Sequence, residues 1–240
     1  MEHDDSRALQ LAIDASVGLL AAGAAVADPA LGVLAAGAAP AASAGAKAAA
    51  HRMQQRAAAT VGVAAATAGV SPEELVDALI RDERRTQLLA VAIQGAYRSA
   101  WERRIRVLGH SLATGALVDD DALVDEEIYW VGILSELEAP HLRMIEYLLR
   151  SDSERPGHMI IVSPDRLGQV SGFRQLRRPA IATLERHALT QRRLGSDLAV
   201  SDRHRWSLNE NSEVYVRGPL TKACFDRFLE AGVAAPRVDD

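Results

Sequence analysis

The chain has 240 residues and a net charge of −5 at neutral pH, which is enough for one large domain or two small ones. Alanine supplies 44 residues while aromatic side chains make up only 4%, which argues against an aromatic-lined catalytic cleft and against base-stacking platforms. The acidic balance excludes a generally basic nucleic-acid coat, though not a local basic patch. The lone cysteine, Cys224, excludes a disulfide framework and a cysteine-based zinc site and fits a reducing compartment.

A small-residue repeat dominates the N-terminal third of the chain. Gly18-Leu-Leu-Ala-Ala-Gly-Ala-Ala25 recurs as Gly32-Val-Leu-Ala-Ala-Gly-Ala-Ala39, and the helix-breaking pair Asp28-Pro29 lies between the copies. This order predicts a helical hairpin over about 6–27 and 30–60. Because small residues at fixed spacing let helix backbones approach closely, we expect the repeat to act in helix packing or at a membrane through Gly18, Gly23, Gly32 and Gly37.

Two interpretations of the hairpin stay open. The uncharged stretches on either side of Asp28-Pro29 span 13 and 17 residues (15–27 and 30–46), fewer than the roughly 20 that cross a bilayer. The hairpin can pack on its own chain or on a second copy, which would make a homo-oligomer, or it can associate with a membrane. The first residues are acidic, unlike the start of a secretory signal, so we expect a cytoplasmic protein, with membrane association as the alternative.

Helix-capping signals organise the central region. Ser71-Pro72-Glu73-Glu74 combines an N-cap, a proline at the first helical position and a capping box, which predicts a short helix. Asp82 is expected to cap one long helix that runs to about Ala113 with an apolar stripe at helical spacing. The acidic run 119–127 indicates the first turn of a helix over about 120–138, because carboxylates there complement the helix dipole.

One segment of the predicted long helix is similar to the nucleophile elbow of α/β-hydrolases. Gly109-His110-Ser111-Leu-Ala113 places a serine as the elbow does, but alanine replaces the second glycine of that motif. The residues before it show a helical pattern where the elbow requires a strand. An enzyme is therefore the least favoured class, and we predict no catalytic residues, no cofactor, no metal site and no small-molecule substrate.

The C-terminal region predicts short helices and strands in alternation. Proline and serine positions mark the helix starts, and short apolar runs mark the strands. A long turn, or wing, is expected between the last two strands. We expect helices over about 140–150, 164–171 and 179–188, a loop over 151–157, strands over 158–162, 189–194 and 213–217, and a last helix from Pro219.

Part of this region resembles a family of regulators. The resemblance rests on Ala182-Thr-Leu-Glu-Arg-His-Ala-Leu-Thr-Gln-Arg-Arg193 and Ser201-Asp-Arg-His-Arg-Trp206, which are similar to the third helix and wing of MarR-type winged-helix proteins. Val214-Tyr-Val-Arg-Gly-Pro-Leu-Thr221 is similar to their last strand and closing helix. The family normally has glycine where Ala188 stands, and its wing is shorter. The resemblance implies a winged-helix domain, DNA binding and a paired, homo-oligomeric state.

A second resemblance rests on the order of segments over more of the chain. These are a Gly/Ala-rich N-terminus, Ser71-Pro-Glu-Glu-Leu75, Arg104-Ile-Arg-Val-Leu-Gly-His-Ser-Leu-Ala-Thr-Gly-Ala-Leu117, the acidic run 119–127 and Leu137-Glu-Ala-Pro-His-Leu142. The order is similar to that of a group of uncharacterised bacterial helical proteins, themselves distantly similar to the Abi-alpha abortive-infection family. This resemblance implies a phage-defence, stress or membrane-linked role and supplies no catalytic residues.

Charge is distributed unevenly along the chain. Residues 72–150 hold 9 basic and 15 acidic residues, whereas residues 151–240 hold 14 basic and 12 acidic ones. The arginines of the C-terminal part can contact DNA phosphates, an acidic protein partner or the run 119–127 of the same chain, or they can form an ordinary solvated face. The candidate binding residues are Arg177, Arg178, Arg186, Arg192, Arg193, Arg203 and Arg205.

We therefore expect a mainly α-helical fold with a small antiparallel sheet near the C-terminus. The expected domains are a Gly/Ala-rich helical hairpin (1–70), a central helical bundle (71–138) and a winged-helix-like domain (139–240). The favoured function is a non-enzymatic interaction protein that self-associates, or associates with a membrane, through its Gly/Ala-rich helices. A winged-helix DNA-binding transcriptional regulator is the alternative.

Overall fold

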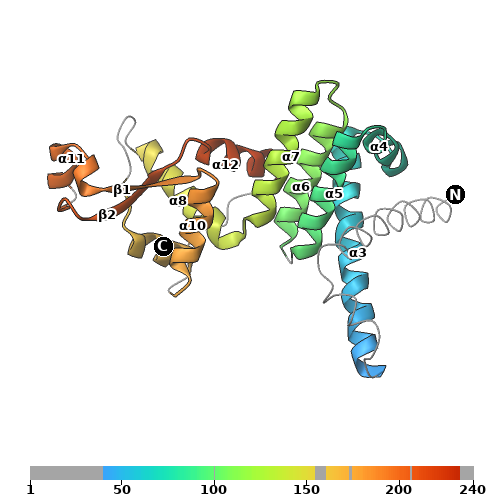
Figure 1. Cartoon of the computed structure of the whole chain (residues 1–240), viewed down its shortest axis with the longest axis horizontal. Helices are drawn as coiled ribbons and strands as arrows, with labels where there is room; N and C mark the ends of the chain where they lie inside the picture. The colour runs from blue at the N-terminus through green and yellow to red at the C-terminus, as the bar shows by residue number, and fades with distance from the viewer. Residues whose placement is uncertain (1–39, 100, 155–160, 173–174, 206, 233–240) are drawn as a thin grey trace. The chain divides into compact units, whose positions relative to one another are not determined.

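The computed structural model describes residues 40–99, 101–154, 161–172, 175–205 and 207–232. These residues form a mainly α-helical fold with a small antiparallel sheet near the C-terminus, which confirms the predicted fold class at that level. They divide into two compact units between Ser135 and Glu136, and each unit is described by itself (Figure 1). Most of the predicted hairpin lies outside the described residues, including Gly18, Gly23, Gly32 and Gly37.

The N-terminal unit is a bundle in which four helices lie side by side and a short helix flanks them (Figure 1). Its core consists of alanine, valine, leucine and isoleucine side chains from the facing stripes. The first helix of the unit packs on the third and fourth, so residues 40–68 belong to the same compact unit as the central helices. The bounds are α3 (Pro40–Ala68), α4 (Pro72–Leu79), α5 (Glu83–Arg98), α6 (Glu102–Ala116) and α7 (Asp121–Glu136).

The predicted helix start at Ser71 is confirmed. The Ser71 hydroxyl accepts the Glu74 N–H at 3.2 Å, and the Glu74 carboxylate accepts the Ser71 N–H at 2.9 Å, which is a complete capping box at the start of α4. The bonds from the Ser71 backbone and then its hydroxyl hold the pKa of Glu74 below its ordinary value. Local residue types alone therefore fix where α4 begins.

The single long helix predicted from Asp82 to Ala113 is wrong, because the chain breaks at Ser99 and continues as α5 and α6. The Ser99 hydroxyl accepts the Trp101 N–H at 3.0 Å, so a side chain bonds a backbone donor that a continuous helix would use. Ser99 itself is extended and fully buried. The predicted apolar stripe nevertheless faces inward on both helices, with Leu89, Ile93, Ile105, Leu108 and Leu112 buried.

A glycine sets the contact between α3 and α6. A Cβ atom at Gly109 would lie 2.7 Å from Cγ1 of Val63 and 2.8 Å from the carbonyl oxygen of Thr60. Because that oxygen belongs to the backbone of α3, it cannot move without shifting the helix. Ser111, two residues further on, is 1% exposed in the middle of α6. The segment that is similar to a nucleophile elbow is thus the packed interior of a helix.

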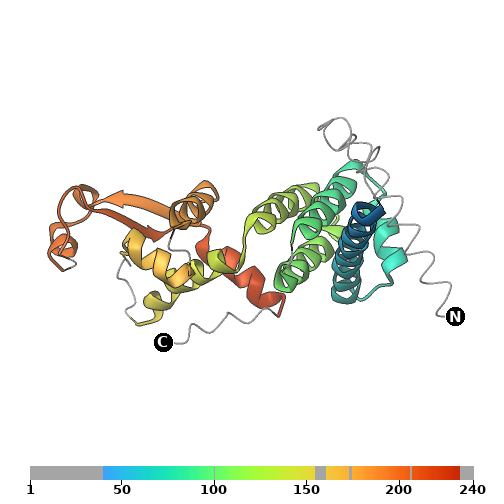
Figure 2. The same ribbon diagram turned by 90° about the horizontal axis from the view of Figure 1, so that it is seen from below.

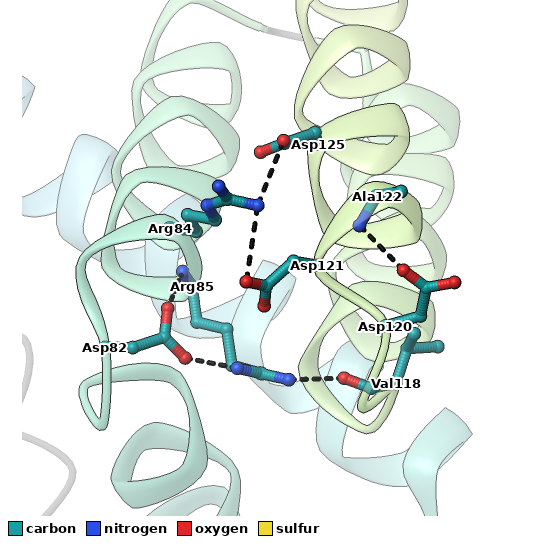
Figure 3. A network of polar contacts seen from close by, with 8 residues as sticks. All are labelled: Asp82, Arg84, Arg85, Val118, Asp120, Asp121, Ala122 and Asp125. Atoms are coloured by element: carbon teal, nitrogen blue, oxygen red, sulfur yellow. Dashed lines mark hydrogen bonds and ion pairs between the residues drawn. The ribbon is translucent and has the colours of Figure 1, made fainter.

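The start of α7 is bonded to the start of α5 by a guanidinium group (Figure 3). The Nη1 atom of Arg84 lies 3.4 Å from the Asp121 carboxylate and 3.2 Å from the Asp125 carboxylate. Asp120 caps α7, because its carboxylate accepts the Ala122 N–H at 2.9 Å. The acidic run 119–127 is therefore the first turn of a helix, as predicted. The Arg84 pairs are about half exposed, so each contributes about 0–1 kcal/mol.

Asp82 is the N-cap residue of α5 and also bonds a second arginine, Arg85 (Figure 3). Its carboxylate accepts the Arg85 N–H at 2.9 Å and also bonds the Arg85 guanidinium, which donates in turn to the Val118 carbonyl oxygen. The Arg85 backbone N–H, followed by the Arg85 guanidinium, holds the pKa of Asp82 below its ordinary value. Ionised Asp82 is therefore favoured in the folded state.

Asp82→Asn is expected to make the acid sensitivity of the protein less steep. A carboxyl whose pKa is lowered by folding stabilises the fold above its ordinary pKa of about 3.9, and this contribution is lost as the pH falls through the lowered value. Urea unfolding between about pH 6 and pH 3 measures the slope. The variant should lose less free energy of unfolding below about pH 4 than the wild type. Equal slopes for the variant and the wild type would contradict the prediction.

In the described residues of the C-terminal unit, three helices precede a strand hairpin, whose connection holds a 3-10 turn and a short helix, and a closing helix follows. Figure 2 shows the hairpin running out from α10 to a tip that carries α11. Both predicted strands of this hairpin are confirmed. The bounds are α8 (Ala139–Glu154), α9 (Pro164–Ser171), α10 (Arg177–Arg186), β1 (Thr190–Leu194), η1 (Gly195–Asp197), α11 (Val200–Arg205), β2 (Glu213–Arg217) and α12 (Thr221–Glu230).

The described residues form a two-stranded sheet, and β2 also makes an isolated bridge on its other side. Strands β1 and β2 pair antiparallel, with Thr190 opposite Arg217 and Leu194 opposite Glu213. On the other side of β2, Tyr215 forms an antiparallel bridge with Val162, with backbone N–H···O bonds of 2.9 and 2.8 Å. Val162 is the described end of the strand predicted over 158–162; residues 158–160 lie outside the described part.

Four boundaries differ from the predictions for physical reasons. Helix α8 continues through 151–154, where a loop is predicted, because polar residues without glycine or proline do not stop a helix. Helix α10 begins two residues before Pro179, since proline is tolerated in a first helical turn. The wing contains η1 and α11 because its apolar residues bury against the sheet. The last helix starts at Thr221, after a turn at Pro219 and Leu220.

Candidate nucleic-acid interface

Helix α10 presents a cationic stripe. Ile181 and Leu184 bury one side of the helix against the unit. The opposite side is exposed and carries side chains four positions apart, which therefore lie along one stripe. These residues are Arg178, Ala182 and Arg186. The small side chain between the two cations leaves the middle of the stripe open to a partner.

The end of α10 requires an unusual backbone conformation. Ala188 has φ of +53°, in the left-handed region that glycine adopts most easily. Its N–H bonds the Glu185 carbonyl at 3.0 Å, and its carbonyl oxygen accepts the Leu220 N–H at 3.3 Å. A Cβ at Gly218 would lie 2.1 Å from the same oxygen. A glycine would adopt this backbone conformation more easily than Ala188 does.

Ala188→Gly is expected to stabilise the C-terminal unit by about 0.5–1 kcal/mol. The left-handed conformation costs an alanine roughly 1–2 kcal/mol, and the greater chain entropy of unfolded glycine offsets about half of the gain. Urea denaturation of the full chain measures the change. The control is Ala182→Gly in the same helix, which should instead lower the free energy of unfolding by about 1 kcal/mol. A loss of stability in both variants would contradict the prediction.

Two further cations stand on the strand hairpin. Successive side chains of a strand point to opposite faces, so Arg192 shares a face with Tyr215, and Arg193 shares the other face with Val214. Both arginines are exposed. The Arg193 guanidinium donates to the Gln191 side chain at 3.2 Å. The hairpin therefore carries a positive charge on each of its faces.

The wing, residues 195–212 between β1 and β2, packs on a small apolar cluster. The cluster consists of Ile161, Leu198, Val214 and Val216, with Leu208 half-buried against it. The two sides of the wing approach closely at Gly195, where a Cβ would lie only 1.9 Å from the Asn209 carbonyl oxygen. Arg203 bonds Glu210 at 3.1 Å across the wing. The predicted long turn is thus an ordered substructure that can hold α11 at the tip of the hairpin.

Internal carboxylates neutralise three of the seven predicted arginines. The pairs are Arg177 with Asp165, Arg186 with Glu136, and Arg203 with Glu210. Within the described residues, Arg178, Arg192 and Arg193 are exposed and have no carboxylate within ion-pairing distance. The side chain of Arg205 lies outside the described part. The cations most available to a partner are therefore Arg178 on α10 and Arg192 and Arg193 on β1.

Sequence reasoning did not predict which acidic residues contact the arginines of this region. The Glu136 carboxylate bonds the Arg186 guanidinium and lies 3.1 Å from Nε2 of His187, although about 50 positions separate them, so no local signal connects these residues. Glu185 lies beside the β1 arginines in an open hollow. The Tyr215 hydroxyl donates to Glu213 at 2.5 Å, and burial, followed by this bond, raises the pKa of Tyr215. Tyr215 is therefore a neutral phenol whose hydroxyl bonds a neighbouring residue of the same strand.

One further cation is positioned by an aromatic ring. Arg166, at the start of α9, lies 5.5 Å from the centre of the Tyr147 ring, and its Nε donates to the Tyr147 hydroxyl at 3.2 Å. The Ser163 cap explains why α9 starts where it does, since its hydroxyl accepts the Arg166 N–H at 3.3 Å. A serine–proline pair is visible in the sequence, but the stacking on Tyr147 is not.

The groups that most often carry chemistry have structural roles here. Cys224 is fully buried on α12, and burial raises the pKa of its thiol to about 12, so the reactive thiolate is not populated at neutral pH. His141 accepts the Glu138 N–H at 2.9 Å at the start of α8. In the described part of the chain, no three acidic, histidine or cysteine side chains gather as metal ligands do.

No family model, no curated protein and no solved structure matches the chain. The functional inference therefore depends on the geometry of the described residues. Among the helices of those residues, none combines the length and the apolar character that crossing a bilayer requires.

Proposed function

We propose that the C-terminal unit is a winged helix that binds duplex DNA. The observation that carries this proposal is the order of its elements: helix α8, the bridge at Val162, helices α9 and α10, strand β1, the wing and strand β2. Because Val162 pairs with Tyr215 on the far side of β2, the bridge takes the place of the first strand of a winged-helix sheet. This arrangement makes α10 the helix that enters the major groove and the hairpin the wing beside it.

The placement of charge supports contact with the DNA backbone. Arg178 is near the start of α10, and a recognition helix contacts DNA through its N-terminal residues. Arg192 and Arg193 extend from the adjacent strand and are exposed. Arginine pairs well with phosphate through its planar guanidinium. Three available arginines predict binding with a weak sequence preference, because phosphate contacts carry no base information.

DNA binding is expected to fall steeply with salt. Neutralising three phosphates gives a slope of about −2.7 in log K against log salt, so affinity for duplex DNA should fall roughly 40-fold between about 50 and 200 mM salt. Fluorescence anisotropy of a labelled duplex with the full chain measures this. Replacing Arg178, Arg192 and Arg193 together with alanine should remove most of the salt dependence.

The matched control for the triple variant is Arg81→Ala, which removes one exposed arginine from the N-terminal unit. It should leave the affinity for DNA within about twofold of the wild type. If the triple variant binds as tightly as the wild type, or if the wild type does not bind at about 50 mM salt, the proposal is wrong.

Self-association through the Gly/Ala-rich helices is the second candidate function, and one observation favours it. The buried stripe of α3 includes Ala57, Val61 and Ala64. Met53 continues this stripe at helical spacing, yet it is 44% exposed, in the part of α3 that follows the repeat. An exposed apolar residue that continues a buried stripe, in the part of the chain that follows the repeat, supports packing against a partner helix, either in a second copy or in a membrane-bound assembly with a defence or stress role.

Sedimentation of the full chain tests self-association. Gly23→Leu combined with Gly37→Leu should shift the sedimenting mass from that of an oligomer to that of a monomer, because leucine at these positions blocks close helix packing. Gly62→Leu is the control, since no atom lies within 4 Å of the position of its Cβ. A wild-type chain that stays monomeric would exclude this candidate, and sedimentation only with lipid vesicles would favour its membrane form.

A further inference from the structure

The outer edge of β1 is exposed as a pairing surface. Gly195 donates to the Ser212 carbonyl at 2.9 Å, and Gly218 donates to the Leu189 carbonyl at 3.3 Å. Backbone groups of alternate residues point to opposite sides of an antiparallel strand. Gln191 and Arg193 therefore use their backbone groups to pair with β2, whereas the backbone groups of Thr190, Arg192 and Leu194 point away from it.

The bridge on the other side of the sheet agrees with this assignment. Tyr215 is opposite Arg192 in the register, and its N–H and C=O both bond to Val162 instead of to β1. In an antiparallel ladder, residues opposite each other either exchange both bonds or exchange none. Arg192 and Tyr215 are thus a non-bonded pair, and the backbone groups of Arg192 face the open side of β1.

Few of the backbone groups of β1 that point away from β2 already form hydrogen bonds. The Leu194 N–H donates to the Asp197 carboxylate at 2.9 Å, and Thr190 is buried. For the N–H and C=O of Arg192 and the C=O of Leu194, the described residues provide no bonding partner on that side. An open hollow of about 520 Å³ lies along this edge, lined by Glu185, Thr190, Gln191, Arg192 and Arg193. The hollow gives an additional strand access to the backbone.

The arginine side chains select what can pair there. A second copy adding through the same edge would bring arginines opposite arginines, and like charges directly across a strand pair are destabilising. Arg192 and Arg193 lie on opposite faces of the strand. A strand with adjacent acidic residues would place one carboxylate beside each of them, in charge-assisted bonds. Glu185 also lines this hollow beside Thr190. Its carboxylate would repel a third acidic residue of the added strand at that position.

We propose that the edge of β1 binds an extended acidic segment of a partner protein by strand addition. The backbone groups of Arg192 and Leu194 supply the hydrogen bonds, and the two arginine side chains supply the preference for adjacent carboxylates. This inference is independent of the proposed DNA binding, because it rests on the sheet register and on the charge of the edge.

A synthetic peptide tests the proposal in the absence of DNA. The probe is a labelled peptide of about ten residues, with alternating valine and threonine around a central Glu-Asp pair, titrated with the full chain by fluorescence anisotropy. Two further peptides carry N-methyl groups on alternate backbone amides. One is methylated at the odd-numbered residues and the other at the even-numbered residues, so that each lacks the N–H groups along one side of the strand. Strand addition uses the amides of one register only, so one methylated peptide should bind about tenfold or more weakly and the other about as well as the parent.

Protein variants test the charge requirement. Arg192→Glu with Arg193→Glu should weaken binding of the parent peptide about tenfold or more, because carboxylates would then face carboxylates. Arg178→Glu is the control, since Arg178 is exposed in the first turn of α10 and does not line the hollow at the β1 edge. It should leave peptide binding within about threefold while weakening binding to DNA.

Three results would overturn the proposal: no binding of the parent peptide, equal effects of the two methylation registers, or equal losses in the β1 and α10 variants. The first excludes the site, the second excludes strand addition, and the third excludes a role for the edge arginines. Because no DNA is present, none of these results depends on the outcome of the DNA titration. Conversely, a failed DNA titration leaves the peptide result valid.

Discussion

Phe228→Ala is expected to lower the free energy of unfolding of the C-terminal unit by about 3–5 kcal/mol. Phe228 is the largest of the fully buried side chains among the described residues. It lies on α12, the closing helix, which packs against α8. Truncating the ring removes its buried apolar surface and leaves a cavity that the surrounding helices can fill only in part. Urea unfolding of the full chain, followed by a probe in the C-terminal unit, measures the loss.

The neighbouring residue provides the control. Leu229→Ala removes an apolar side chain from the same helix, but Leu229 is 49% exposed, so its loss should change the free energy of unfolding by less than about 0.5 kcal/mol. The sequence pattern predicts both residues as apolar positions of the last helix and does not distinguish them. Equal losses in the two variants would contradict the burial of Phe228.

Gly109→Ala is expected to destabilise the N-terminal unit by up to about 2 kcal/mol net. The added methyl group would lie 2.8 Å from a backbone oxygen of α3, at Thr60, and 2.7 Å from Val63. Overpacking of this kind costs typically 1–3 kcal/mol, and it opposes the gain of up to about 1 kcal/mol that alanine brings to a helix interior. Because the oxygen belongs to a helix backbone, relief requires α3 to move away from α6.

The opposite sign is expected at a glycine of α3. No atom lies within 4 Å of the position of a Cβ at Gly62, so Gly62→Ala should bring the helix-propensity gain alone and stabilise the unit by up to about 1 kcal/mol. Thermal unfolding of the two variants beside the wild type compares them directly. If both glycines give a gain, α3 and α6 are not in close contact at Gly109.

Local chemistry explains which elements are predictable from the sequence. Helix starts at Ser71 and Ser163 each depend on a hydroxyl and a proline within a few residues, so the chain itself carries the signal. The break at Ser99 is different, because a serine in an apolar helical pattern is compatible with either outcome. The bond from the Trp101 N–H to the Ser99 hydroxyl, together with the burial of both resulting helices against α3 and each other, favours the break.

The candidate site shows the same limit. All seven arginines are visible in the sequence as an excess of positive charge. Their availability depends on carboxylates that the fold brings in from elsewhere, such as Glu136, about 50 positions before Arg186, and Asp165, 12 positions before Arg177. Composition therefore predicts a basic region, whereas tertiary packing decides which arginines can bind a partner.

The single cysteine can report how often the closing helix α12 detaches from the C-terminal unit. Because the thiol of Cys224 is buried on α12 and its pKa is raised to about 12, a thiol reagent can modify it only when α12 detaches from its neighbours. The rate of modification of the unaltered protein under native conditions therefore measures how often the closing helix opens. Ligands of the C-terminal unit, DNA or peptide, can be detected by how far they slow that rate, with no label attached to the protein.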